Sequence, residues 1–152
     1  MIVLRSLLSI AILPGVVLVL LPWLIVRGTP LSPLAWVGAI PLALGVVLSA
    51  GCVFEFASGG RGTPAPWDAP RRFVASGPYR VVRNPMYVAG VLIIVGEAIA
   101  FVSLSLLVYL AAVVIVWHLL VVLYEEPTLA RQFGAEYEAY RTRVHRWVPR
   151  LP

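Results

Sequence analysis

Two short polar segments of this chain carry side chains that can do chemistry. Arg80, Arg83 and Asn84 lie in the first segment, and Glu125 and Glu126 lie in the second. A guanidinium binds carboxylate or phosphate groups in fork geometry, and an amide side chain donates and accepts hydrogen bonds at once. Carboxylates accept hydrogen bonds from amines and hydroxyls. Each segment adjoins an apolar run, so we expect the two to meet at one side of a membrane and form a site.

Simpler roles are open to the same residues. Arg80 and Arg83 can anchor the chain at anionic lipid headgroups, and Asn84 can cap a helix that begins at Pro85. The two glutamates can form a solvated acidic pair at a helix end. As helix neighbours they point about 100° apart, which lets one face the site and the other face an arginine.

The elements that must position these residues are apolar helices. Of the 152 residues, 61% are hydrophobic and 12% are charged, and the mean hydropathy is +0.92. This composition predicts an all-α integral membrane protein with a single domain over residues 1–152. We expect four transmembrane helices, a polar loop and a C-terminal amphipathic helix. Their predicted ranges are 6–26, 33–56, 86–102 and 106–124 for the spans, 57–85 for the loop, and 126–146 for the amphipathic helix.

The distribution of arginine predicts the topology. The 57–85 loop and the tail after residue 125 each contain five Arg, whereas the 27–32 turn contains one. The positive-inside rule then places the loop, the tail and both termini in the cytosol. The net charge of +5 suits contact with anionic lipid. We expect no nucleic-acid partner, and no protein partner is evident.

The tail carries the clearest helical periodicity. Its apolar residues recur at spacings of four, four, three and four, which places them on one helix face. Gly134 is expected to divide the helix into two pieces, and the helix can lie on the membrane or fold back over the loop. The residues of this face are Leu129, Phe133, Tyr137, Tyr140 and Val144.

Four further residues lie within or beside the spans. Glu97 and His118 are intramembrane ionisable groups, which are functional candidates by default; they can pair with each other, or one can act as a base. Glu55, near the end of the second span, is expected to meet an arginine of the loop. Cys52 is expected to be a packed, inert thiol.

Three motifs in order resemble those of the membrane-embedded methyltransferases, which include isoprenylcysteine carboxyl methyltransferases and phospholipid N-methyltransferases. The carboxyl methyltransferase branch usually has His where Asn84 stands, so the chain is more similar to the phospholipid branch. The resemblance covers residues 77–149, about half of the chain. The motifs are Gly77-Pro78-Tyr79-Arg80-x-x-Arg83-Asn84-Pro85-x-Tyr87-x-x-Gly90, Glu125-Glu126-x-x-Leu129, and Phe133-Gly134-x-x-Tyr137-x-x-Tyr140 leading to Pro149.

The resemblance implies S-adenosylmethionine as methyl donor, bound on the cytosolic side, and a lipid or other hydrophobic acceptor. No metal is expected, because methyl transfer from a sulfonium requires mainly alignment and exclusion of water. The catalytic residues implied are Arg83, Asn84 and Glu126. The cofactor-binding residues implied are Tyr79, Arg80, Pro85, Tyr87, Gly90, Glu125, Glu126, Tyr137 and Tyr140.

Other functions remain open at this point. The tyrosines can equally form an interfacial aromatic belt or pack the tail helix. A steroid-reductase-like enzyme that uses NADPH has a similar arrangement of Arg, Pro, Tyr and Glu-Glu. A small four-span transporter or assembly factor is the non-catalytic alternative, although such a protein does not need the long polar loop or the amphipathic tail.

Overall fold

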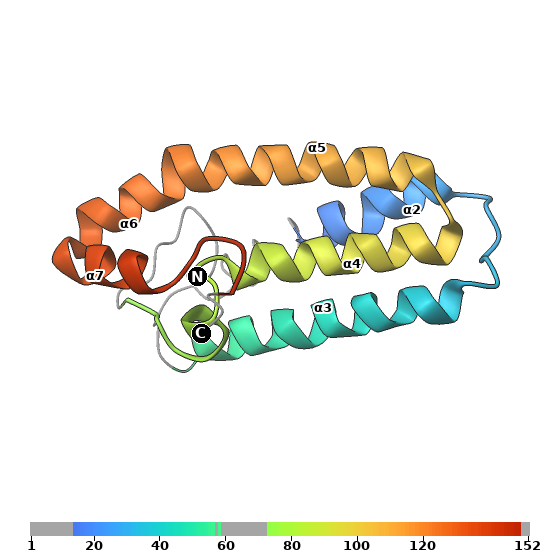
Figure 1. The fold of residues 1–152 in the computed structure, drawn as a ribbon. Coiled ribbons are helices and arrows are strands. Elements are labelled where there is room, and N and C mark those ends of the chain that lie inside the picture. The colour runs from blue at the N-terminus through green and yellow to red at the C-terminus, as the bar shows by residue number, and fades with distance from the viewer. Residues whose placement is uncertain (1–13, 57, 59–72, 150–152) are drawn as a thin grey trace, which may run out of the picture.

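The computed structural model describes residues 14–56, 58 and 73–149, and every regular element within them is helical. The predicted all-α class is therefore confirmed for this part of the chain. Three long helices lie side by side, and a shorter one packs against the second and third of them (Figure 1). In chain order the elements are η1 (Val16–Leu20), α2 (Leu21–Val26), α3 (Ala35–Glu55), η3 (Gly77–Arg80), α4 (Pro85–Phe101), α5 (Leu104–Leu120), η4 (Val121–Glu125), α6 (Glu126–Phe133) and α7 (Ala135–Arg143).

Two helices in the described ranges are long and apolar enough to cross a membrane. They are Ala35–Glu55, with 21 residues, and Leu104–Phe133, with 30 residues, which combines α5, η4 and α6. Val16–Val26 and Pro85–Phe101 are shorter apolar helices. The arrangement of four spans therefore stays a prediction. Residues 6–13 of the predicted first span and most of the predicted loop lie outside the described residues.

Glycines hold α3 directly against α4. A Cβ atom added to Gly38 would lie 2.4 Å from the carbonyl oxygen of Gly96, and one added to Gly45 would lie 2.6 Å from that of Ala89. No side chain fits at such separations, so the two helix backbones touch. Small residues in apolar helices commonly allow such a close contact.

The turns and the polar segments occupy opposite ends of the bundle. The α2–α3 and α4–α5 turns lie together at one end, where the Ser32 amide donates to the Ala100 carbonyl oxygen at 2.9 Å. Ser103 ends the second turn and caps α5, since its hydroxyl accepts from the Leu106 amide at 3.3 Å. The 73–84 segment and the C-terminal helices lie at the other end (Figure 1). The fold therefore brings both predicted polar segments to the same end.

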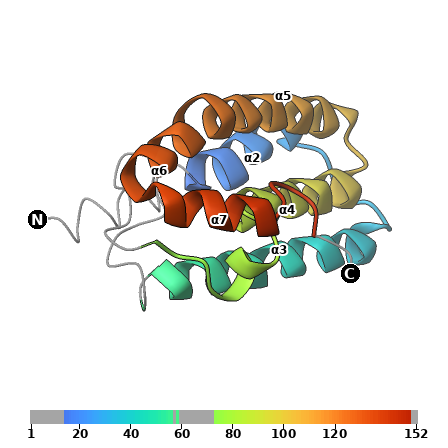
Figure 2. The ribbon, with the colours of Figure 1, turned by 60° about the vertical axis from the view of Figure 1, so that its left-hand side comes forward.

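The tail folds as its periodicity predicts. Gly134, with φ of +50°, divides it into α6 and α7. Tyr137, Tyr140 and Val144 are buried together and pack on Phe73. The helices thus fold back over the segment before α4 (Figure 2). The helix ends at residue 143 rather than 146, because residues 144–149 turn back towards the start of α4.

Candidate functional site

The segment before α4 is anchored by the end of α3. Gly77 has φ of +52°, and a Cβ atom there would meet the Glu55 side chain. The Ser76 hydroxyl donates to the Glu55 carboxylate. Ser76 is thus a partner of Glu55, and the expected pairing with a loop arginine stays a prediction because Arg61, Arg71 and Arg72 lie outside the described residues. Tyr79 then packs edge-on against Phe56, with ring centroids 5.4 Å apart.

A π-helical turn carries Glu125 and joins α5 to α6, which begins at Glu126. One continuous helix results, and π-turns inside α-helices are frequent at functional sites. Glu125 and Glu126 point to different partners, as expected for helix neighbours. Glu125 accepts a hydrogen bond from the Tyr87 hydroxyl, whereas Glu126 pairs with arginines.

Glu126 is the centre of a buried ion cluster. Arg146 holds it in fork geometry, with Nε 2.7 Å from Oε1 and Nη2 2.9 Å from Oε2. Arg83 Nη1 lies 3.2 Å from the same Oε1. Glu126 is only 9% exposed. Its hydrogen bond to Arg146 raises the pKa of that guanidinium, which burial opposes.

Two nitrogen atoms of Arg83 make no hydrogen bond to the described part of the protein. Its Nε and Nη1 atoms are buried and make no hydrogen bond within the part of the chain that the structure describes. The contact of Nη1 with Glu126 is an ion pair without hydrogen-bond alignment. A buried donor without a partner is costly, and an anionic group beside Arg83 would remove that cost.

A C-terminal strap, residues 144–149, lies across the start of α4. The Arg83 amide donates to the His145 carbonyl oxygen at 2.8 Å. Asn84 Nδ2 donates to the Arg146 carbonyl oxygen at 3.2 Å. Asn84 does occupy the N-cap position, but its side chain makes no capping hydrogen bond. It joins the strap to α4 instead.

Aromatic rings surround the Tyr87–Glu125 pair. The Tyr87 ring lies 5.2 Å from that of Trp117 and 6.3 Å from that of Trp147. Trp147 Nε1 donates to His118 Nδ1 at 3.3 Å. His118 therefore pairs with the strap and not with Glu97, which corrects one of the expectations for these two residues.

The remaining predicted residues fall into two groups. Tyr140 is buried and donates to the Tyr79 carbonyl oxygen at 2.6 Å, and Tyr137 is buried beside it. Burial raises the pKa of all three phenols, so they stay neutral. Arg80 is exposed, outside the ion cluster. Four predicted cofactor-binding residues therefore lie beside the site or connect its segments, and they do not contact the Tyr87–Glu125 pair. They are Tyr79, Arg80, Tyr137 and Tyr140.

Pro85 and Gly90 have packing roles in this arrangement. Pro85 is buried at the first position of α4, where its fixed φ favours helix initiation. A Cβ atom added to Gly90 would lie 2.5 Å from Trp117 Cη2. Gly90 thus leaves room for the ring that packs on Tyr87.

Sequence reasoning missed the strap residues Arg146 and Trp147, which complete the site. The available signal was an apolar and basic run, His145 to Val148, directly before Pro149 and beyond the periodic helix. No spacing rule connects such a run to residues 83 and 126. Only the reversal of the chain after α7 does so.

Comparison with known proteins identifies the family of this chain. The family model described as phospholipid methyltransferase matches residues 34–136. That range exceeds half of the chain and contains both polar segments, so the chain belongs to the phospholipid methyltransferase family. Searches of curated proteins and of solved structures returned no match.

Family membership makes methyl transfer to a lipid the activity class of this chain. The match gives no support to the reductase or the transporter alternative. The predicted resemblance to the phospholipid branch is confirmed. The identity of the methyl donor and the membrane side of the site are separate questions.

Proposed function

We propose that this protein transfers a methyl group from S-adenosylmethionine to a lipid or other hydrophobic acceptor at the cytosolic membrane face. The observation that carries the proposal is the meeting of Arg83 and Tyr87 with Glu125 and Glu126 at one end of the bundle. These residues come from segments about forty positions apart, and both segments belong to the family's matched region.

The residues present fit the cofactor. Its amino acid end carries a carboxylate, for which Arg83 Nε is a suitable donor, since it is buried and makes no hydrogen bond in the described part of the chain. Its amine and ribose hydroxyls are donors, for which the Glu125 carboxylate is a suitable acceptor. The rings of Tyr87, Trp117 and Trp147 offer faces for the adenine and for the positive sulfonium.

Glu126 and Arg146 act in this proposal as positioning residues. Glu126 is already bonded to Arg146 in fork geometry, so its remaining task is to hold Arg83 by charge. Asn84 fixes the strap that carries Arg146 and Trp147. Of the three implied catalytic residues, Arg83 is then the one that touches the cofactor. Asn84 and Glu126 act through other residues and do not touch it.

Methyl transfer mainly requires that the protein align the methyl donor with the acceptor. The bound cofactor supplies a methyl group on a positively charged sulfur that is already a good leaving group. The side chains around Tyr87 would orient the acceptor atom in line with that methyl group and exclude water. Glu125 lies where it can accept a proton from an acceptor amine or hydroxyl.

The cytosolic location rests on charge. Arg80, Arg83, Arg131, Arg141 and Arg143 lie on the segments at the site end of the bundle, and the opposite turns carry Arg27. Positive charge is retained on the cytosolic side of membranes. The proposed acceptor then reaches the site laterally from the inner leaflet.

A radiolabelled-methyl assay tests the proposal. Membranes containing the protein are incubated with S-adenosylmethionine labelled in its methyl group, and the extracted lipids are separated. We expect a labelled lipid with wild type and roughly tenfold less label, or lower, with Arg83→Gln. This magnitude corresponds to the loss of one hydrogen bond to a charged group. Arg141→Gln, in an exposed ion pair with Glu138, is the matched control and should retain full labelling. Absence of labelled lipid with wild type would refute the proposal.

A further inference from the structure

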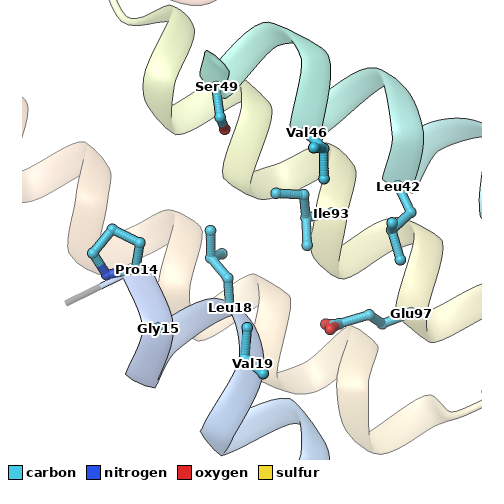
Figure 3. A pocket seen from close by; sticks show the side chains of 9 residues that line it. All are labelled: Pro14, Gly15, Leu18, Val19, Leu42, Val46, Ser49, Ile93 and Glu97. Atoms are coloured by element: carbon cyan, nitrogen blue, oxygen red, sulfur yellow. The ribbon is translucent and has the colours of Figure 1, made fainter. Parts of the chain in front are cut away.

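An apolar cavity lies between three helical segments of the bundle. Its volume is about 390 Å³, and η1, α3 and α4 line it (Figure 3). Almost all of its wall is aliphatic, with Leu18 and Val46 among the lining residues. Val46 is 51% exposed at the outer edge of the bundle, so the cavity opens to the surroundings. Its size and lining suit a hydrocarbon chain.

Glu97 and Ser49 are the polar side chains in this wall. The Glu97 carboxyl group points into the cavity from α4 (Figure 3). The Oε2 atom is buried and has no hydrogen-bond partner among the residues that the structure describes. Tyr109 does not satisfy it, because its hydroxyl donates to the Val17 carbonyl oxygen at 2.7 Å. An unpartnered buried carboxyl oxygen is costly, and a donor group on a ligand in the cavity would satisfy it.

The cavity adjoins the proposed methyl-transfer site near Gly90. A Cβ atom added to Gly90 would lie 2.5 Å from Trp117 Cη2 and 3.4 Å from Cδ2 of Leu18, which lines the cavity. Trp117 in turn packs on Tyr87. Glu97 follows Tyr87 by ten residues, about 15 Å along the helix axis. The cavity therefore extends away from the site towards the opposite end of the bundle.

We propose that this cavity holds the apolar body of the methyl acceptor, and that Glu97 selects acceptors that carry a second hydrogen-bond donor. The donor, a hydroxyl or an amine, would lie roughly 15 Å from the atom that is methylated. The acceptor is then an amphiphile that is polar at two places, not a simple alkyl chain. Because the ligand is taken to be the acceptor, this inference rests on the proposed function.

Photo-crosslinking tests the cavity without requiring turnover. Two long-chain probes with a diazirine in the chain are compared in nanodiscs, one ending in a hydroxyl and the other in the matching methyl ether. An amine-ended probe distinguishes the two kinds of donor. We expect labelled peptides from α3 and α4, and about tenfold more labelling by the best donor probe than by the ether. Glu97→Leu should reduce this preference to about one while the ether still labels.

Neighbouring positions on α3 provide the control for the cavity itself. Val46→Trp would fill the cavity, whereas Val47→Trp would add the same ring at an adjacent, 70% exposed position that does not line it. We expect labelling to be lost with the first variant and kept with the second. Equal labelling by donor and ether probes, or crosslinks outside η1, α3 and α4, would overturn the inference. Failure of the labelled-methyl assay alone would refute the proposed function and leave the binding result standing.

Discussion

Glu126 and Arg146, twenty residues apart in sequence, form a two-bond ion pair at 2.7 and 2.9 Å. The pair connects the start of α6 to the strap that follows α7, and Arg83 joins it from the start of α4. Three segments of the chain therefore depend on one carboxylate. This relationship explains how residues 83, 126 and 146 come to share one site.

Glu126→Gln is expected to destabilise the protein. Removing the charge leaves two guanidinium groups close together with no anion, and breaking a buried pair from one side costs about 3 kcal/mol. Unfolding in mixed micelles would measure the loss in the free energy of unfolding. Glu138→Gln removes a carboxylate from a pair whose side chains are 49% and 48% exposed, and should change stability by less than about 1 kcal/mol. Equal effects of the two variants would contradict the central role of Glu126.

Tyr87→Phe is expected to weaken cofactor binding without loss of fold. The ring keeps its contact with Trp117, but Glu125 loses the hydroxyl that orients its carboxylate. Loss of a hydrogen bond to a charged group should raise the Kd for S-adenosylmethionine about tenfold, measurable by calorimetry. Tyr109→Phe removes a hydroxyl that bonds the Val17 carbonyl away from the site, and its Kd should equal that of wild type. An unchanged Kd for Tyr87→Phe would exclude Glu125 from the cofactor site.

Gly38→Ala is expected to separate α3 from α4. The new Cβ atom would lie 2.4 Å from one backbone atom and 2.8 Å from another, and backbone atoms cannot move aside as a side chain can. Overpacking of this kind costs about 2 kcal/mol. Gly51→Ala is the control, since its nearest neighbour is Pro78 Cγ at 3.4 Å; helix propensity should there raise stability by up to about 1 kcal/mol. The melting temperature of the purified protein distinguishes the two outcomes.

The proposed topology can be tested by labelling introduced cysteines. Cys52, the single native cysteine, is fully buried and should react little with an impermeant maleimide. Glu136→Cys places a thiol on exposed α7 and Thr29→Cys places one on the opposite turn. We expect the first to be labelled only from the cytosolic side and the second only from the other side. Labelling of both from one side would refute the membrane-spanning arrangement proposed for the bundle.

Residue type and short-range spacing were sufficient to predict several helical elements. The apolar run and Pro85 predicted where α4 begins, and the tail periodicity predicted which face would be buried, because both depend on neighbouring residues. Gly134 was expected to divide the tail helix and does so. The predicted helix end at residue 146 lies three residues beyond the observed end at residue 143. The chain leaves the helix there because Arg146 contacts Glu126, and local sequence does not reveal this tertiary contact.

Side-chain pairing was less predictable than the helices. Glu55 contacts Ser76, a partner that the sequence did not suggest, and His118 was considered as a partner of Glu97 but pairs with Trp147. The Glu97–His118 pairing joined two plausible polar groups without knowledge of which helix faces meet. Rotation of a helix about its axis decides such pairs, and composition carries little information about that rotation.

By itself, the sequence determined the helical class, the apolar runs, the three motifs and the periodic face of the tail, because each depends on residue type and short-range spacing. The tertiary structure alone decided that Tyr87 meets Glu125, that Arg146 completes the ion cluster, and that Glu97 faces a cavity. Those contacts depend on how helices distant in sequence pack and on how each helix is rotated about its own axis. The close glycine contact between α3 and α4 and the turn after α7 set that arrangement.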